Sequence, residues 1–140
     1  MIRSAIVDTG PLVAFLDRAE RHHRWAAEQV RQLEAPLLVC EPVLAETMFL
    51  LARLPTAQDA ILGWLETGAL RVAFQVGENL AELRSLLRKY RDRPISLADA
   101  CVVRMAELFE HHHVFTLDSD FSVYRKNGRD PLRLIAPSQA

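Results

Sequence analysis

The stretch Ala5-Ile6-Val7-Asp8-Thr9-Gly10-Pro11-Leu12 decides how this chain folds. Three apolar residues lead into an aspartate, and a small hydroxyl residue, a glycine and a proline then precede an apolar helical pattern. This order predicts a strand that ends at Asp8 and a tight turn into a helix, because proline suits the first turn of a helix. An acid at such a junction faces the end of a sheet, where open α/β folds place their ligands.

Outward from this stretch, short apolar runs alternate with helical patterns along the chain. The predicted strands cover residues 4–7, 37–40, 70–74, 114–117 and 132–135. The predicted helices cover residues 11–17, 22–33, 43–54, 57–66, 78–90 and 96–110, with a loop at 119–130. Such alternation predicts a mainly parallel central sheet with helices on both faces, a three-layer α/β/α fold. The length of 140 residues suits one domain over residues 1–140.

Composition narrows the class of protein. Half of the residues are hydrophobic and 25% are charged, which excludes a disordered chain. No apolar run approaches the roughly 20 residues that span a bilayer, and the start of the chain lacks a signal-peptide pattern. We therefore expect a cytoplasmic protein without a membrane partner. In that compartment Cys40 and Cys101, which lie in apolar runs, are expected to be reduced core residues.

The charge balance is nearly neutral. The chain has 17 basic and 18 acidic residues, for a net charge of −1. A protein that coats nucleic acid usually carries a basic excess, so the balance weighs against that class. It does not exclude nucleic acid as a substrate, because bound cations and local basic patches act within a neutral total.

Four acids stand where the predicted fold brings segments together. Asp8 follows the first strand and Asp118 follows the fourth. Glu46 lies about one turn inside a helix, and Asp99 lies in the first turn of another. Since the carboxyl ends of parallel strands share one edge with the helix starts that follow them, the four carboxylates are expected to meet there.

Such a cluster has a chemical consequence. Two like charges about 4 Å apart repel by roughly 4 kcal/mol at a surface-like dielectric, so the cluster needs a cation. Hard divalent ions such as Mg²⁺ or Mn²⁺ prefer oxygen ligands. They activate water and stabilise phosphate charge, which favours phosphodiester hydrolysis.

Each acid also has a structural interpretation. Asp99 forms a Ser-x-x-Asp capping box with Ser96, which needs no catalysis. Asp8 would serve as a turn residue, and 118–120 as an acidic loop. Glu46 would be a solvated helix residue, although apolar neighbours surround it in the sequence.

Four short motifs occur in order along nearly the whole chain. They are Val7-Asp8-Thr9-Gly10-Pro11-Leu12-Val13-Ala14, Leu44-Ala45-Glu46-Thr47, Ser96-Leu97-Ala98-Asp99-Ala100 and Phe115-Thr116-Leu117-Asp118-Ser119-Asp120-Phe121. With these motifs the chain resembles the PIN-domain family and, within it, the ribonuclease toxins of bacterial VapBC-type toxin–antitoxin pairs. The resemblance implies a metal-dependent endoribonuclease.

The resemblance also implies roles for individual residues. It makes Asp8 and Asp99 the most direct ligands of Mg²⁺ or Mn²⁺, with Glu46 and Asp118 completing the shell, so that all four acids are catalytic. It places the hydroxyls of Thr9 and Thr116 beside the acids, where they orient carboxylates or water. Asp120 is either an outer acid of the site or a residue that fixes its loop.

The resemblance implies partners too: an RNA substrate, a cognate antitoxin and a second copy of the chain in a homodimer. The apolar helix 43–54 lies either deep in the core or at a partner interface, and helix 57–66 offers a second surface. Three other functions stay open: a non-catalytic binding or regulatory module, a PIN nuclease of RNA processing, and a hydrolase of small phosphate esters.

Several conspicuous residues are expected outside the site. The histidines at 22–23 and 111–113 are assigned to helix ends, and Trp25 and Trp64 to core or interface anchors. Arg91 and Arg93 precede the helix of Asp99 and are either solvated linker charges or contacts to RNA phosphates.

Overall fold

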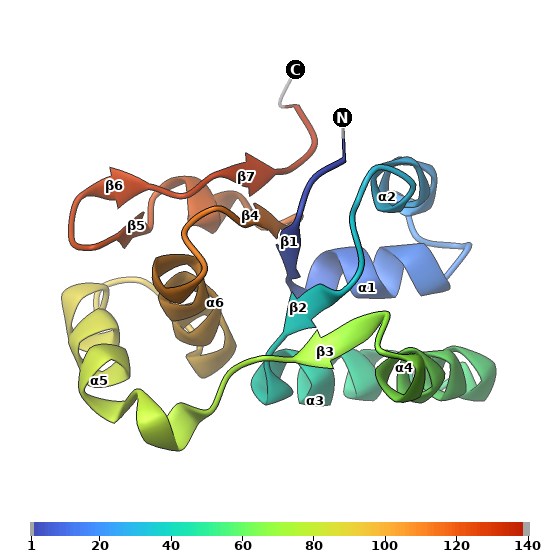
Figure 1. The fold of residues 1–140 in the computed structure, drawn as a ribbon, viewed down its shortest axis with the longest axis horizontal. Helices are drawn as coiled ribbons and strands as arrows, with labels where there is room; N and C mark the ends of the chain where they lie inside the picture. Colours follow the sequence, from blue (N-terminus) through green and yellow to red (C-terminus); the bar gives the residue numbers. More distant parts are fainter. Residues whose placement is uncertain (1, 139–140) are drawn as a thin grey trace.

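The computed structural model describes residues 2–138 and places five strands in one parallel sheet (Figure 1). The strands are β1 (Ala5–Val7), β2 (Leu37–Val39), β3 (Leu70–Val72), β4 (His113–Phe115) and β7 (Leu134–Ile135). Their order across the sheet is β3-β2-β1-β4-β7, and every neighbouring pair is parallel. The predicted parallel sheet is confirmed.

Within residues 2–138, six α-helices cover the sheet. They are α1 (Thr9–Leu16), α2 (His23–Val30), α3 (Glu41–Leu50), α4 (Pro55–Thr67), α5 (Leu80–Lys89) and α6 (Leu97–Leu108). In Figure 1, α5 and α6 lie on one side of the sheet, and α1, α2 and α4 lie on the other. Helix α6 packs on β1 and β4 and carries α5 on its outer side, while α1 packs on α2 and α3. The three-layer α/β/α prediction is confirmed.

The strand order contains one reversal. From β1 the chain steps outward to β2 and β3, and it then returns to place β4 on the other side of β1. The helices that follow β1 and precede β4 therefore lie on opposite faces of the sheet. A crevice for a ligand forms at such a reversal, at the carboxyl ends of the strands. In this chain that place lies between the ends of β1 and β4, where Asp8 and Thr116 follow the strands.

The segment expected as a loop at 119–130 contains ordered structure. A 3₁₀ turn, η2, covers Ser119–Ser122, and strands β5 (Arg125–Lys126) and β6 (Asp130–Pro131) form an antiparallel hairpin. Asn127 and Gly128 form its turn with φ angles of 53° and 80°. Asn-Gly is the strongest short hairpin signal because both residues tolerate positive φ, so the printed sequence carried the information.

Several boundaries differ from the predictions. Helix α1 begins at Thr9 rather than Pro11, so Asp8 is its N-cap residue. A 3₁₀ turn, η1 (Val76–Glu78), precedes α5. Helix α6 ends at Leu108 and His113 opens β4, so the histidines at 111–113 do not end a helix. Helix α3 begins two residues earlier than predicted and ends at Leu50, and α4 extends beyond the predicted helix 57–66 at both ends. The strands are shorter than predicted by one or two residues.

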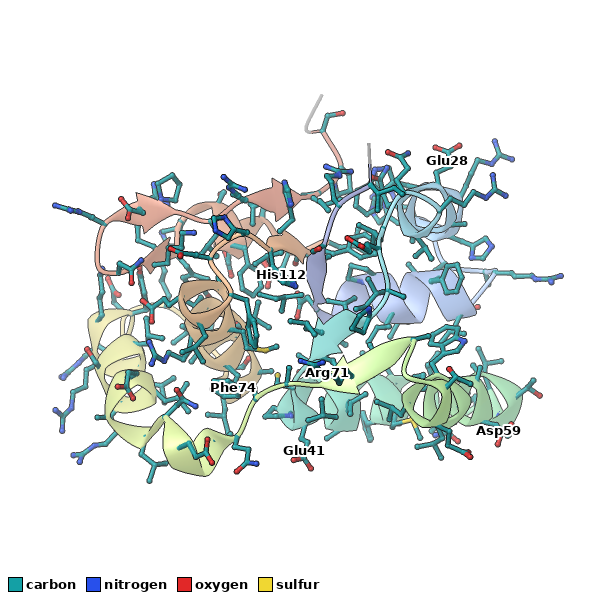
Figure 2. The ribbon with its side chains drawn as sticks, viewed as in Figure 1. Glu28, Glu41, Asp59, Arg71, Phe74 and His112 are labelled. Atoms are coloured by element: carbon teal, nitrogen blue, oxygen red, sulfur yellow. The ribbon has the colours of Figure 1, made fainter. Side chains whose placement is uncertain are left out.

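Helix α3 is not a core helix. Its buried residues are Val43 and Thr47, whereas Phe49 is 78% exposed and Leu50 is 56% exposed. Glu41 opens the helix with an exposed side chain (Figure 2). The helix therefore has one buried face and one exposed apolar face, so the interpretation that helix 43–54 lies deep in the core is wrong.

The aromatic and sulfur assignments agree with the structure. Trp25 packs against Phe115 with 5.6 Å between ring centroids, and Trp64 packs against Phe15 at 5.7 Å. Cys40 and Cys101 are buried and free of a disulfide. Within residues 2–138, no helix combines the length and apolar character needed to cross a bilayer.

Candidate active site

Asp8 follows β1 at the point where the strand order reverses. Its backbone N–H continues the sheet pairing and donates to the carbonyl of Phe115 at 3.0 Å. Its carboxylate does not cap α1 by any bond to the described residues, and it accepts a hydrogen bond from the Thr116 hydroxyl at 2.7 Å instead. The residue is only 7% exposed. The interpretation of Asp8 as a turn residue is therefore correct for its backbone. Its carboxylate is instead held by Thr116, at the ends of β1 and β4.

The surroundings of Asp8 favour its neutral form. Burial is the largest effect and raises the pKa of this carboxyl from 3.8 to about 6. The hydrogen bond from Thr116 opposes the shift, while the charges of Asp99 and Asp118 add to it. A carboxylate in such a place gains from a cation far more than an exposed carboxylate does.

Thr116 joins the ends of the two central strands. Its hydroxyl donates to Asp8 and accepts a hydrogen bond from the backbone N–H of Asp118 at 2.9 Å. Gly10 also lies against Leu117, which follows β4. A side chain at this position would bring its Cβ within 3.1 Å of the Cβ of Leu117, closer than most such contacts. Glycine in the first turn of α1 thus permits the close approach of the residues that follow β4.

Asp99 starts α6 and has two roles in the geometry. It completes the capping box, because its carboxylate accepts from the Ser96 N–H at 3.1 Å while its own N–H donates to the Ser96 hydroxyl at 3.0 Å. The structural interpretation is therefore correct. Burial is the main cause that raises the pKa of this carboxyl, and the charges of Asp118 and Glu46 raise it further. Asp99 therefore also belongs to the electrostatic cluster.

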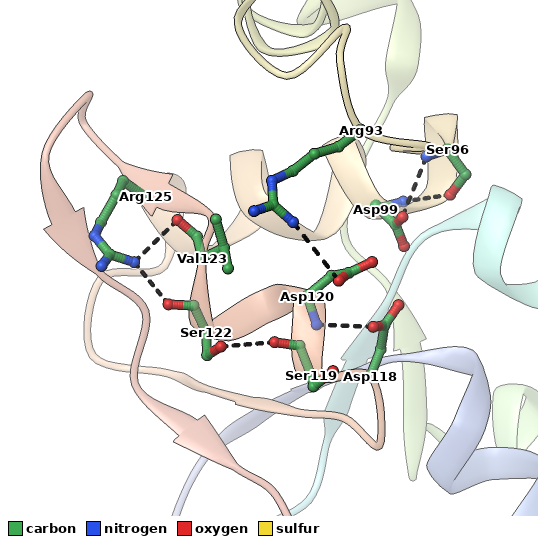
Figure 3. A network of polar contacts seen from close by, with 9 residues as sticks. All are labelled: Arg93, Ser96, Asp99, Asp118, Ser119, Asp120, Ser122, Val123 and Arg125. Carbon is green, nitrogen blue, oxygen red and sulfur yellow. Dashed lines mark hydrogen bonds and ion pairs between the residues drawn. The ribbon is translucent and has the colours of Figure 1, made fainter.

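Asp118 and Asp120 lie around the 3₁₀ turn η2. One carboxylate oxygen of Asp118 accepts from the backbone N–H of Asp120 at 2.9 Å. The side chain of Asp120 instead approaches the guanidinium of Arg93, with 4.0 Å between Nη1 and Oδ1. Figure 3 shows Asp99, Asp118 and Asp120 around a common space, with Arg93 reaching toward it from the connector before α6. The 118–120 loop is thus part of the crevice.

The remaining candidates lie at the margins of the cluster. Glu46 is exposed on α3, and its charge acts on Asp99. Thr9 is buried next to Asp8 in the chain, and its hydroxyl has no hydrogen-bond partner within residues 2–138. An unpaired buried hydroxyl beside a buried carboxylate is a place where a bound ligand or water supplies the missing bond.

The donor set fits a hard cation by its chemistry. The carboxylates and hydroxyls of the crevice offer only oxygen atoms, which Mg²⁺ and Mn²⁺ prefer. As the side chains stand, no three histidine, cysteine, aspartate or glutamate side chains within residues 2–138 lie close enough to hold one ion together. The fit therefore rests on the buried Asp8 and the orphan Thr9 hydroxyl.

Tyr124 was missed by the sequence analysis. The residue is fully buried, and within the described part of the chain its hydroxyl has no hydrogen-bond partner. Burial is the main cause that raises the pKa of this phenol, and the nearby charges of Asp99, Asp120 and Asp118 add to the effect. An aromatic residue shortly after an acidic loop carries no pattern that reveals this position.

Three comparisons place the fold among known proteins. A family model described as the PIN domain matches residues 5–127. The ribonuclease VapC26 of Mycobacterium tuberculosis is 32% identical over 126 residues, which cover 88% of this chain and 93% of that protein. The crystal structure of VapC20 from the same organism, described as a toxin that cleaves the sarcin-ricin loop, superposes with a TM-score of 0.76 at 22% identity. The superposition covers 86% of this chain and 94% of the VapC20 chain.

Proposed function

The chain belongs to the PIN-domain family, within the VapC-type ribonucleases, and we propose that the crevice between β1 and β4 is its centre for RNA hydrolysis. One observation carries the proposal: Asp8 is buried, and the charges of Asp99 and Asp118 act on it without a cation among the described side chains. A protein retains such a costly arrangement where it serves chemistry.

Asp8 and Asp99 would hold Mg²⁺ or Mn²⁺ most directly, and Glu46 and Asp118 would complete the shell. When bound, such an ion activates water and stabilises the charge that develops on the scissile phosphate and the leaving oxygen. The oxygen donors and the need of Asp8 for a positive neighbour support this assignment.

The chain's own residues orient these acids. Thr116 donates to one oxygen of Asp8 and thereby holds this carboxylate toward the end of β4. Ser96 does the same for Asp99 through its backbone N–H. Thr9 supplies a buried hydroxyl that orients a carboxylate or water. Support of this kind typically changes metal affinity by ten- to a hundredfold.

The test is cleavage of ribosomal and transfer RNA by the purified protein. We expect cleavage with Mg²⁺ or Mn²⁺ that stops with a chelator, and a loss of about a hundredfold or more for Asp8→Asn. Asp59→Asn is the matched control, because Asp59 lies exposed on the outside of α4 (Figure 2). Circular dichroism shows whether each variant keeps its fold.

Other outcomes identify other functions. Equal cleavage by the wild type and Asp8→Asn contradicts the assignment of the site. A folded protein that binds no divalent ion in calorimetry is a binding or regulatory module. Hydrolysis of small phosphate esters without RNA cleavage identifies a phosphate-ester hydrolase.

We extend the proposal to partners and location. A cytoplasmic toxin needs an antitoxin that occludes the crevice, and a homodimer would cover the apolar side chains that α3 and α4 expose. Phe49, Leu50 and Leu62 are 78%, 56% and 51% exposed, which supports a protein contact there. A neighbouring gene for a small protein with a DNA-binding start would favour the toxin role. A nuclease of RNA processing would lack that neighbour.

Light scattering tests the dimer. Phe49→Asp should turn a dimeric protein into a monomer, because the charge would be buried at the interface. A wild-type monomer at micromolar concentration contradicts the dimer and leaves the nuclease proposal intact.

A further inference from the structure

Arg93 is a basic side chain beside the acid cluster whose donors are uncommitted. Its guanidinium lies 4.0 Å from the Asp120 carboxylate, and both side chains are about two-fifths exposed, at 41% and 39%. At this length and exposure an ion pair contributes less than about 1 kcal/mol. No hydrogen bond within residues 2–138 uses the Arg93 side chain, so its five N–H donors remain free.

A second arginine in Figure 3 shows the contrast. Arg125 donates from Nη1 to the carbonyls of Ser122, Val123 and Tyr124 at 2.8, 3.0 and 3.1 Å. These bonds commit Arg125 to holding the turn that follows η2. Arg93 has only the distant carboxylate of Asp120, and its side chain points into the space that Asp99 and Asp118 also face.

The backbone beneath Arg93 is anchored. The N–H of Arg93 donates to the carbonyl of Tyr90 at 2.9 Å. Tyr90 is buried, its ring packs on Tyr124 with 5.0 Å between centroids, and its hydroxyl accepts from the N–H of Arg125 at 2.9 Å. Because the backbone is already fixed, a ligand that binds Arg93 has to order only its side chain.

The acids create a need for such a group. Four ionised carboxylates around one divalent cation still leave a negative site, which repels the phosphates of an RNA strand. An arginine at the rim offsets this repulsion, and its planar fork binds phosphate oxygens in pairs.

We propose that Arg93 binds an RNA phosphate next to the scissile bond and that Asp120 is a positioning residue that holds the guanidinium over the acid cluster. The inference rests on the proposed ribonuclease function. It gives Asp120 a role through Arg93 and not as a ligand of the ion.

The first test measures binding without cleavage. In the Asp8→Asn background, fluorescence anisotropy follows a fluorescein-labelled, mixed-sequence RNA of about 20 nucleotides at several salt concentrations. Arg93→Gln should weaken binding about five- to tenfold and reduce the slope of log K against log salt by about 0.7, the value for one phosphate of a single strand. The RNA affinity of Arg93→Lys should lie between those of the parent protein and Arg93→Gln, because lysine keeps the charge and lacks the planar fork of the guanidinium.

Arg31→Gln is the control for loss of charge alone. Arg31 is exposed at the end of α2. The next residue, Gln32, accepts a hydrogen bond from the N–H of Arg3, which precedes β1, whereas Asp8 follows β1. It should bind RNA within about twofold of the parent protein. Equal effects of Arg93→Gln and Arg31→Gln would overturn the proposal.

The second test separates positioning from metal binding. Asp120→Asn should leave the Mn²⁺ affinity measured by calorimetry unchanged, and Asp118→Asn should lower it about tenfold or more. In the Asp120→Asn background, Arg93→Gln should cost less RNA affinity than in the parent, since the guanidinium is no longer held. A weaker Mn²⁺ affinity of Asp120→Asn, or an unchanged or larger effect of Arg93→Gln, would overturn the role of Asp120.

Kinetics of the otherwise wild-type enzyme distinguish this inference from the proposed function. Arg93→Gln should raise KM about fivefold and leave kcat within about twofold, the signature of lost uniform binding. If the wild type cleaves RNA and Arg93→Gln has unchanged KM and RNA affinity, the inference alone fails. If the wild type neither binds Mn²⁺ nor cleaves RNA, the proposed function fails.

Discussion

The molecule gathers acidic side chains in two places and treats their charge differently in each. Between α5, α6 and the β5–β6 hairpin, Arg104 donates to Asn79 at 2.9 Å and to Glu107 at 3.1 Å, with Glu82 4.0 Å away. The second oxygen of Glu107 accepts from the N–H of Asn127. Here both glutamates, Glu82 and Glu107, have the guanidinium of Arg104 as an internal partner.

The crevice between β1 and β4 has no such cation at its centre. Asp8 is as buried as any acid in the described chain, yet its partner is the neutral hydroxyl of Thr116, and the nearest charges are those of other acids. An acid in an ion pair links two elements of the fold. A buried acid without a cation lowers stability, and a bound metal ion would remove this cost. The first arrangement is structural and the second is suited to function.

The largest expected effect is a gain in the free energy of unfolding when the charge of Asp8 is removed. Because the pKa of Asp8 rises from 3.8 to about 6 on folding, its contribution to stability is complete below about pH 4 and is lost as the pH rises through about 6. Without divalent ions, Asp8→Asn should therefore match the wild type near pH 4 and exceed it by about 3 kcal/mol near pH 8.

Urea unfolding with a chelator at both pH values checks this difference. Added Mg²⁺ should stabilise the wild type above pH 6 and have less effect on the variant. A stability difference that does not change with pH would contradict the buried charge of Asp8.

Removing the charge of Arg104, beside Glu82 and Glu107, should lower stability, whereas removing the charge of Asp8 should raise it. Arg104→Gln should lower the free energy of unfolding by about 2 kcal/mol, because it leaves Glu107 and Glu82 without their cation. Cleavage of RNA should be unchanged in the folded variant. Arg129→Gln is the matched control, since Arg129 also lies 4.0 Å from an acid but is 88% exposed. Equal urea midpoints for the two variants would show that the Arg104 network does not stabilise the fold.

A smaller effect should follow from the hydroxyl that joins the two strand ends. Thr116→Val removes the bond to Asp8 and the acceptor of the Asp118 N–H. The pKa of Asp8 should rise further, and the Mn²⁺ affinity at pH 7 should fall about tenfold. Isothermal calorimetry with Thr67→Val, an exposed threonine on α4, as control measures this change. Equal affinities would show that Thr116 does not orient the site.

The smallest expected effects on stability compare two tyrosines whose rings pack edge to face, Tyr90 and Tyr124. Tyr90→Phe should cost about 1 kcal/mol, because the N–H of Arg125 loses its acceptor. Tyr124→Phe should lie within about 0.5 kcal/mol of the wild type, since its hydroxyl is unpaired within residues 2–138. Thermal unfolding in a chelator compares them. A larger cost for Tyr124→Phe would show that its hydroxyl is structural.

Much of this arrangement was predictable from the sequence. Apolar runs followed by Asp8 and by Asp118 predict strands and the edge that they share, because the side-chain pattern of a short buried strand is local. The Ser96–Asp99 capping box is local as well, and the structure has it. The Asn127–Gly128 hairpin was equally readable and was overlooked.

What the sequence by itself determined is the order of the elements and which acids follow them, since both depend on neighbours along the chain. Only the tertiary structure decided how each charge is met. It set Asp120 opposite Arg93, left Glu46 exposed beside the cluster, buried the Tyr124 hydroxyl without a partner and exposed Phe49. The reason is physical: burial and the distances between charges come from contacts between segments that lie far apart in the sequence.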